Sequence, residues 1–335
     1  MKAIKFFAIS AMAAAMITSC SSEDELSQSN YPSDNIIRVT AGVNNAKTRA
    51  EGAGTEMKND FSLTIVNKNA SKYTYTDKVF SKSSGDWACS ETLLWQKSDA
   101  LVDIVAFAPA QTGKFNGVYA EGNIQPIAYS VADDQSTKSD NNDLLYYYAP
   151  GFNPGKSLVD KKLNIQFNHA FCMIDIVVTL GTEFNKPKVL DDSPIVKVTL
   201  DGTKIAANVD VKNAATGSTT TTAASVVTAS ETATPTTITT TKGTFTKAAN
   251  EEANAKSCFS CIAIPQTVAG KTFKVSLMTA GKLYEWTSAE PVELKSGYRY
   301  TLNLSMGNDV VLLKGGSISA TPWTEITSDK PLETD

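Results

Sequence analysis

The strongest constraint on the fold is a period-two alternation of apolar and polar residues that recurs along most of the chain. Successive side chains of a β-strand point to opposite faces, so each alternating run predicts a strand with one face on a core and the other in water. No segment keeps an apolar period of 3.6 residues, so we expect few and short helices. The alternating runs are residues 37–43, 61–65, 163–168, 205–211, 273–277 and 298–306. Many short strands with Gly, Asn and Asp turns between them predict an all-β chain built from antiparallel β-sandwiches.

The run that begins at Leu163 changes phase near its end. Phe167 and His169 continue its odd-numbered apolar face, whereas the even-numbered residues from Cys172 to Leu180 are apolar afterwards. A shift of one residue moves every later side chain to the other face of a sheet. We therefore predict a β-bulge or a short break at residues 169–172.

The N-terminus has the form of an export signal. Lys2 and Lys5 precede a twelve-residue apolar stretch, which is shorter than the roughly 20 residues of a membrane-spanning helix. Small residues then lead to Cys20, as in a lipobox, so we predict that residues 1–19 are a cleaved signal peptide. Cys20 would become the lipid-modified first residue of the mature protein and anchor it to the outer membrane.

The remaining length predicts two domains, because single hydrophobic cores rarely serve more than about 250–300 residues. Residues 20–35 are polar and predict a flexible tether. We place an N-terminal β-sandwich at 36–160 and a C-terminal β-sandwich at 161–327, with the boundary in a Pro- and Gly-rich stretch near 150–162.

The second domain carries a Thr-rich insertion at residues 213–247. Fifteen threonines lie between Thr216 and Thr246, and only Glu231 and Lys242 are charged there. Such a segment buries little apolar surface, so we predict an exposed, mobile loop or an extended hairpin.

Charge and cysteine content exclude several classes of function. The formal charge of −4 falls to −6 once Lys2 and Lys5 leave with the signal, and no basic run suggests a nucleic-acid partner. Besides Cys20 the chain has four cysteines, too few for a disulfide scaffold, and their pairing stays open. They are Cys89, Cys172, Cys258 and Cys261.

No catalytic arrangement emerges, so we predict that the chain is not an enzyme and needs no cofactor. The chain has a single histidine, His169, and no nucleophile elbow. Gly155, Lys156 and Ser157 lack the preceding glycine of a phosphate-binding loop, since Pro150 stands in its place.

We also expect no metal site. A zinc site from His169, Cys172, Cys258 and Cys261 is disfavoured, because Cys258 and Cys261 should face opposite sides of one strand. We take Cys172 and Cys258 as small core residues instead. The acidic residues Asp133, Asp134, Asp140 and Asp143 lack the spacing of a calcium loop and predict a solvated turn.

Several separated segments together resemble the fimbrillin family, the type V pilins of Gram-negative anaerobes and their accessory lipoproteins. They are Trp95 with the strand Val102–Pro109, Asp143–Tyr146, Phe167–Ala170 followed by Ile174–Ile176, Ile264–Gln266, Gly297–Leu304 and Pro322–Thr324. Each segment is weak alone, but their order and spacing make the resemblance specific. The Thr-rich insertion has no counterpart in the family pattern.

The resemblance implies two tandem transthyretin-like antiparallel β-sandwiches and a fimbrial subunit with a structural or adhesive role. It also implies that a protease cuts after an arginine, here between Arg49 and Ala50, and so frees the strand that carries Ile37, Val39, Ala41 and Val43. Another fimbrial subunit, of the same or a related kind, would then donate a strand to the vacated groove. The protein would move from the outer membrane into the fimbrium after this cleavage.

Two alternatives stay open. The first is an unprocessed lipoprotein that anchors the fimbrium. The second is a surface glycan-binding lipoprotein, for which Trp87, Trp95, Trp286 and Trp323 could stack on sugars. A host or bacterial surface ligand is compatible with either an adhesin or a glycan-binding protein.

Overall fold

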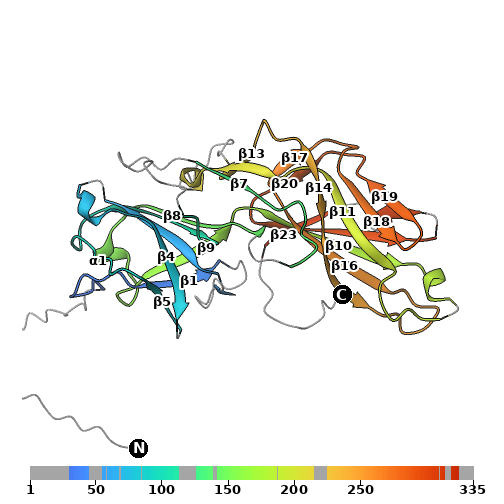
Figure 1. Cartoon of the computed structure of the whole chain (residues 1–335), viewed down its shortest axis with the longest axis horizontal. Coiled ribbons are helices and arrows are strands. Elements are labelled where there is room, and N and C mark those ends of the chain that lie inside the picture. The colour runs from blue at the N-terminus through green and yellow to red at the C-terminus, as the bar shows by residue number, and fades with distance from the viewer. Residues whose placement is uncertain are drawn as a thin grey trace, which may run out of the picture.

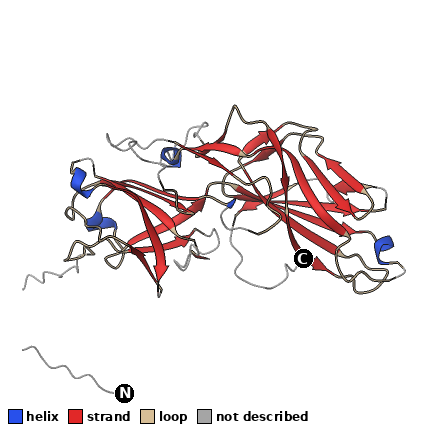
Figure 2. Cartoon of the chain, viewed as in Figure 1, coloured by secondary structure: helices blue, strands red, loops and turns tan. Residues whose placement is uncertain are grey.

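The computed structural model describes residues 30–44 and 55–323, apart from residues 58, 68, 84, 113–125, 139–141, 187, 215–224, 309 and 314–317. Strands dominate this part of the chain (Figure 2). Its helical elements are the four-residue helix α1 (Pro154–Ser157) and the short 3-10 turns η1 (Ser71–Tyr73), η3 (Thr182–Asn185) and η4 (Val211–Ala214). None of the described helices is long and apolar enough to span a bilayer. The prediction of an all-β chain with few, short helices is confirmed.

The first lobe, at the left of Figure 1, is a sheet whose pairings close on themselves. Its strands are β1 (Val39–Val43), β2 (Thr55–Glu56), β3 (Phe61–Val66), β4 (Tyr75–Ser83), β5 (Asp86–Cys89), β6 (Val102–Ala108), β8 (Leu145–Phe152) and β9 (Leu163–His169). The order β1-β5-β4-β3-β6-β8-β9 is completed by the parallel pairing of β1 with β9, and β2 adds to β1 outside this ring.

The ring is narrow at two seams. Strand β1 meets β5 through one residue pair, and β8 meets β9 through two. The seams set β9, β1 and β2 apart from the other five strands, so the lobe lies between a closed barrel and a two-layer sandwich. Its interior is aromatic: Phe61 packs on Phe80, Trp87 and Phe167, with ring centroids 4.9–5.5 Å apart.

The second lobe has two sheets around one core. Its larger sheet runs β15 (Thr241–Thr246), β16 (Lys256–Ala263), β10 (Cys172–Leu180), β21 (Tyr298–Met306) and β22 (Val311–Leu313), with β23 (Ser319–Pro322) also on β21. The smaller sheet runs β14 (Pro235–Thr239), β11 (Ile195–Lys204), β18 (Lys274–Thr279) and β19 (Leu283–Thr287). Strands β17 (Gln266–Val268) and β20 (Val292–Leu294) form a separate pair. The core of this lobe follows from the alternation of apolar and polar residues along its strands. In β10, Ile174, Ile176 and Val178 are fully buried, whereas the residues between them are less buried.

A third small sheet joins the two lobes. Strand β7 (Ile127–Ser130) pairs with β12 (Ala206–Val209), which pairs with β13 (Val227–Ala229). Beneath it, Phe107 of the first lobe and Phe171 belong to one buried cluster with Val209. The segment that follows β7 is fixed to the second lobe by the buried side chain of Gln135. This side chain accepts a hydrogen bond from Ile262 N at 2.7 Å and donates one to Ile262 O at 2.9 Å. The junction is therefore a packed core of its own.

The predicted phase change at 169–172 is confirmed as a break. Strand β9 ends at His169 and β10 begins at Cys172 in a different sheet. The chain therefore passes between the lobes at Ala170–Phe171, beyond the boundary placed near 150–162. Strand β9, assigned from the sequence to the 161–327 domain, pairs with β1 and β8 of the first lobe instead.

Two segments expected to be loose contribute to the fold where the structure describes them, although many of their residues are exposed. Residues 30–35, part of the predicted tether, form a turn in which Pro32 is buried and Trp95 N donates to Asn35 O at 2.8 Å. The prediction of an exposed, mobile loop or an extended hairpin at 213–247 is wrong for residues 225–246, because their strands β13, β14 and β15 pair in three different sheets. Ile238 is fully buried there, so threonine's β-propensity outweighs the low apolar content.

Candidate functional site

Strand β1 holds the closing position in the first lobe (Figure 1). It pairs in parallel with β9 along its whole length, from Val39 opposite Leu163 to Val43 opposite Phe167. Its end is fixed by two hydrogen bonds, from Asn44 N to Phe167 O at 2.7 Å and from Asn44 Nδ2 to Asn168 Oδ1 at 2.9 Å. On its other side β1 has one residue pair with β5 and two with β2. Strand β9 is therefore its principal partner.

The inward face of β1 and of the residue before it is apolar. Ile37, Val39 and Val43 are buried with 6%, 3% and 4% of their surface exposed, and Ala41 is half-buried against the same core. They share that core with Leu163, Ile165 and Phe167 of β9, all fully buried. The structure thus places all four sequence-selected residues on the core of the first lobe. Whether this strand is exchanged stays a prediction.

The chain that leads into β1 is fixed by polar contacts at the surface. Arg38 donates two hydrogen bonds to the Asp34 carboxylate, at 3.0 and 2.6 Å. These bonds are the main reason that the pKa of Asp34 falls from 3.8 to about 2. Ile37 N donates to Leu93 O at 2.9 Å, and Leu163 N donates to Arg38 O at 2.8 Å.

The processing and lipidation residues lie outside the described residues. Arg49 and Ala50 fall in the segment 45–54 between β1 and β2, and Cys20 precedes residue 30. Strand β2 folds back antiparallel on β1, with Thr55 opposite Val43. The predicted cut would therefore fall between two strands that pair with each other.

His169, at the end of β9, lies in a buried polar contact at the lobe junction. Its Nδ1 is 2.6 Å from Asp143 Oδ2, and its ring stacks on Trp323, with centroids 3.8 Å apart and planes 10° apart. His169 is 5% exposed and Trp323 is 8% exposed. Sequence reasoning selected each of these residues for other reasons, and nothing in the sequence signals that they meet.

All four cysteines in the described part of the chain are free thiols. Cys261 is buried and Cys258 is only half-buried on the other face of β16, so the opposite-face prediction holds. The choice of Cys258 as the core residue was wrong, because the odd-numbered face of β16 is the buried one. Burial raises the pKa of the Cys172 thiol and raises that of Cys261 to about 12.

The other candidate groups do not converge within the described residues. Gly155, Lys156 and Ser157 form α1, whose backbone packs against Ser98. Asp134 Oδ1 accepts a hydrogen bond from Ser136 N, whereas Asp143 contacts His169. No cluster of three or more metal-ligating side chains occurs in this part of the chain. Each tryptophan packs on another ring, as Trp95 does on Phe152 and Trp286 on Phe273.

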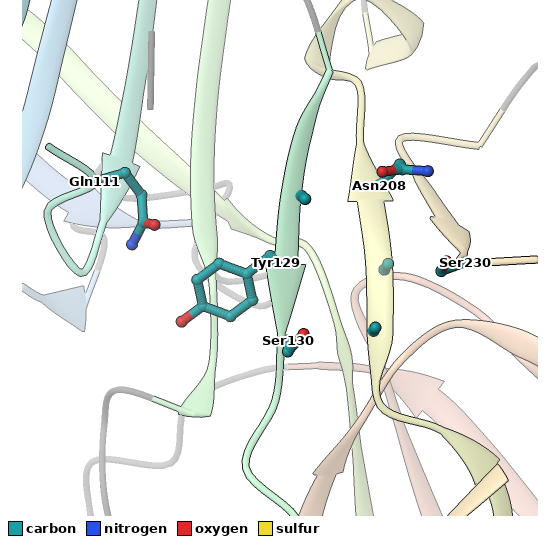
Figure 3. Close-up of a pocket in the computed structure, with 8 residues that line it drawn as sticks. Gln111, Tyr129, Ser130, Asn208 and Ser230 are labelled. Carbon is teal, nitrogen blue, oxygen red and sulfur yellow. The ribbon is translucent and has the colours of Figure 1, made fainter. Parts of the chain in front are cut away.

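A pocket of about 500 Å³ lies on the joining sheet (Figure 3). Its polar lining groups are uncharged and come from Gln111, Tyr129, Ser130, Asn208 and Ser230, and alanines of β7 and β12 complete it. Burial, with a smaller effect of Asp143, raises the pKa of Tyr129 to about 12, so its hydroxyl stays neutral. The sequence did not predict this pocket, because its residues come from separate strands and a loop.

These features define a β-rich protein in which strands from the two ends of the described chain lie at sheet edges or seams. The chain belongs to the fimbrillin-like family, which matches over residues 48–323. Its fold is similar to that of a candidate cell adhesion protein from Bacteroides ovatus, at 17% identity and a TM-score of 0.57, over 88% of this chain and 99% of that one. A candidate cell adhesion protein from Bacteroides uniformis matches at 16% identity and a TM-score of 0.52, over 88% and 100%. No functionally curated protein matches.

The family gives this chain a coarse function. It is a fimbrium-associated, surface-exposed protein of structural, non-enzymatic character that assembles with other fimbrial subunits.

Proposed function

We propose that the protein is a fimbrial subunit that is exported as a lipoprotein and assembled by donor-strand exchange after proteolysis at Arg49. The observation that carries this proposal is the parallel pairing of β1 with β9. Strand β1 closes the first lobe, yet the only chain joining it to β3 and the rest of the lobe passes through the segment that contains Arg49. A cut there leaves β1 held to the body by non-covalent contacts.

The groove beneath β1 would need another strand once β1 left. Ile37, Val39 and Val43 cover an aliphatic and aromatic floor that includes Leu163 and Phe167. Each buried side chain of this size is worth about 1.5–3 kcal/mol, so an open groove is unstable in water. The freed edge of β9 would also lack main-chain hydrogen-bond partners, which an added strand restores.

The donor strand in this proposal comes from the C-terminal region of another subunit. Strands β22 and β23 lie on the same edge of β21, and residues 319–322 of β23 are exposed. Strand β22 pairs through three residues and β23 through four. Such short edge strands are easier to detach than the central strands of the sheet.

Lipidation of Cys20 would hold the precursor at the outer membrane until the cut releases residues 50–335. The unprocessed anchor is the alternative, in which Arg49 is never cut. A Cys20→Ala chain should lose all incorporation of a fatty-acid probe, and undiminished label would disprove the lipid assignment. The family resemblance further supports a transthyretin-like sandwich in each lobe.

The experiment is limited cleavage with an arginine-specific protease. The whole sequence contains three arginines, Arg38, Arg49 and Arg299. Arg38 is bound to Asp34, and Arg299 is bound to Asp175 inside the β10–β21 pair, so Arg49 is the expected site. Protein spanning residues 21–335 should yield a fragment starting at Ala50 and then form concentration-dependent oligomers.

Arg49→Lys is the matched control, because it keeps the charge but resists the protease. It should stay intact and monomeric under the same conditions. A cleaved protein that keeps β1 bound and stays monomeric at high concentration would count against strand exchange and favour the anchor.

The pocket supports a second candidate function, the binding of a neutral glycan. Its amides, hydroxyls and one tyrosine ring suit an uncharged polyhydroxylated ligand, and it lies at a lobe junction, where ligand sites are common. Titration with neutral oligosaccharides should give binding that Asn208→Ala abolishes and Asn164→Ala, on β9, leaves unchanged. No binding across a panel of neutral glycans would rule this function out.

A further inference from the structure

The C-terminal strand β23 is held by backbone pairing of its four residues with β21 and by the residue that follows it. Its four residues are exposed, and its side-chain contacts with β21 are long, at 3.4 Å from Ser319 Oγ to Thr301 O and 3.5 Å from Thr321 Oγ1 to Arg299 O. Trp323 follows directly and is buried on the His169 ring. Among its side-chain contacts, the stack of Trp323 is therefore the one buried support that β23 has beyond its backbone pairing with β21.

A tight turn of the chain supports the tryptophan from the other side. Trp323 N donates to Gly297 O at 2.8 Å, and Gly297 N donates to Phe171 O at 2.9 Å. Ser296 Oγ donates to Ala170 O at 2.7 Å. Gly297 has a φ of +71°, which favours glycine at this position. The seat of Trp323 is thus built on residues 169–171, where the chain crosses between the lobes.

The seat contains buried polar atoms without partners. Within the described residues, neither His169 Nε2 nor Asp143 Oδ1 has a hydrogen-bond partner, although both atoms are buried. Buried polar atoms without partners carry a desolvation cost, which water would relieve if Trp323 left. The packing gained from the stack is therefore partly offset, and opening is easier than at a purely apolar contact of the same size.

Strand β9 connects this seat to β1. Asn44 at the end of β1 binds Phe167 O and Asn168 Oδ1, and the next residue of β9 is His169. At that end β9 has only two residue pairs with β8. Loss of β1 would therefore remove the partner strand of β9 up to Phe167, two residues before the histidine that carries Trp323, and leave the end of β9 with its two pairs to β8.

We propose that the Trp323–His169 stack is a latch that keeps the C-terminal strand in place until β1 has left the first lobe. This inference rests on the proposed function, since it assigns an order to the two ends of one subunit. A subunit with β1 in place keeps its C-terminal strand folded on β21. Departure of β1 loosens the end of β9, opens the stack and frees β23 for a neighbouring subunit.

The coupling is tested on uncleaved protein spanning residues 21–335 by hydrogen exchange of the β23 amides. Val43→Ala weakens β1 opposite Phe167, and it should speed exchange at residues 319–323 by roughly tenfold. Val275→Ala is the matched control, because it makes the same deletion in the second lobe on β18, outside β9. It should leave the β23 rates within about twofold, provided that both variants keep slow exchange in the β10 core.

The latch itself is tested with Trp323→Ala. This variant should speed β23 exchange on the order of 100-fold whether or not β1 is in place, whereas Thr321→Ala should change it little. Equal β23 rates in Val43→Ala and Val275→Ala would overturn the coupling. Unchanged rates in Trp323→Ala would overturn the latch.

These measurements do not depend on cleavage at Arg49. If β23 responds as expected but the cleaved protein fails to oligomerise, the latch stands and the strand-exchange function fails. If the cleaved protein oligomerises while β23 is insensitive to Val43→Ala, the function stands and the latch is wrong.

Discussion

Replacement of Val39 by alanine should test whether β1 is part of the core or only covers it. Val39 is 3% exposed and lies opposite Leu163 and Trp87. The change removes two methyl groups, worth about 0.8 kcal/mol each in transfer free energy, and leaves a cavity beside β9. We therefore expect the free energy of unfolding of the first lobe to fall by about 2–3 kcal/mol. The neighbouring Thr40→Ala should cost less than about 1 kcal/mol, because Thr40 is exposed.

The assay is urea unfolding of both variants. It is followed by the fluorescence of Trp87 and Trp95, which both lie in the first lobe, with Trp286 and Trp323 replaced by phenylalanine in every chain, the reference included. Comparison of midpoints at equal slope isolates the change in stability. A peptide covering residues 36–46 should rebind to cleaved protein that has lost β1. The Val39→Ala change in this peptide should weaken its affinity by about 30- to 150-fold. Equal losses for Val39→Ala and Thr40→Ala, or a loss below about 0.5 kcal/mol for Val39→Ala, would refute the view that β1 fills the groove.

Three further predictions follow from the packing and charges. Deletion of residues 216–240 should lower the melting temperature by several degrees, because it removes β13 and β14; an unchanged melting temperature would mean that these strands contribute nothing. Arg38→Gln should raise the pKa of Asp34 from about 2 toward 3.8 in a side-chain NMR titration. Since that pKa is lowered in the folded state, the Arg38–Asp34 contact contributes to stability above pH 4, and this contribution disappears toward pH 2. An unchanged Asp34 titration in Arg38→Gln would assign the lowered pKa to the backbone hydrogen bond instead. Alkylation of the native protein should label the half-buried thiols of Cys89 and Cys258 well before the buried thiols of Cys172 and Cys261. Equal labelling rates would contradict this difference in burial.

Alternation of apolar and polar residues predicted seven of the described strands, because the two faces of a half-buried strand differ in residue type; these are β1, β3, β9, β10, β12, β18 and β21. The runs at 163–168 and 298–306 are β9 and β21, and the phase change at 169–172 marks the crossing between lobes. The run at 61–65 is β3, but the prediction that one of its faces lies in water is wrong, because all six residues of β3 are buried. The alternation does not show which strands pair with one another. Parallel pairing of β1 with β9 joins segments about 120 residues apart, so the lobe that contains β9 could not be read from its sequence.

Low apolar content misled the prediction for the Thr-rich segment. Residues 225–246 have few large side chains, but Val227 and Ile238 are buried in hydrophobic cores. Backbone pairing of β13 with β12 and of β14 with β11 holds the remaining residues in strands. Within the candidate site, the apolar face of β1 was predictable from period two. The contact of His169 with Asp143 and Trp323 was not, because three distant strand ends meet there through the fold.

The separation between β1 and β9 also sets the order in which the protein can fold. Asn164 lies 124 positions after Thr40, which it contacts, so β1 has no principal partner until about half of the chain has been made. Contacts of such long range form late, because the intervening chain must first lose its freedom. We therefore expect β1 to dock last, after the other strands of the first lobe have paired. Until β1 docks, the first lobe exposes a strand edge to neighbouring chains. The docking rate of β1 therefore decides whether that edge pairs within its own molecule or with another molecule.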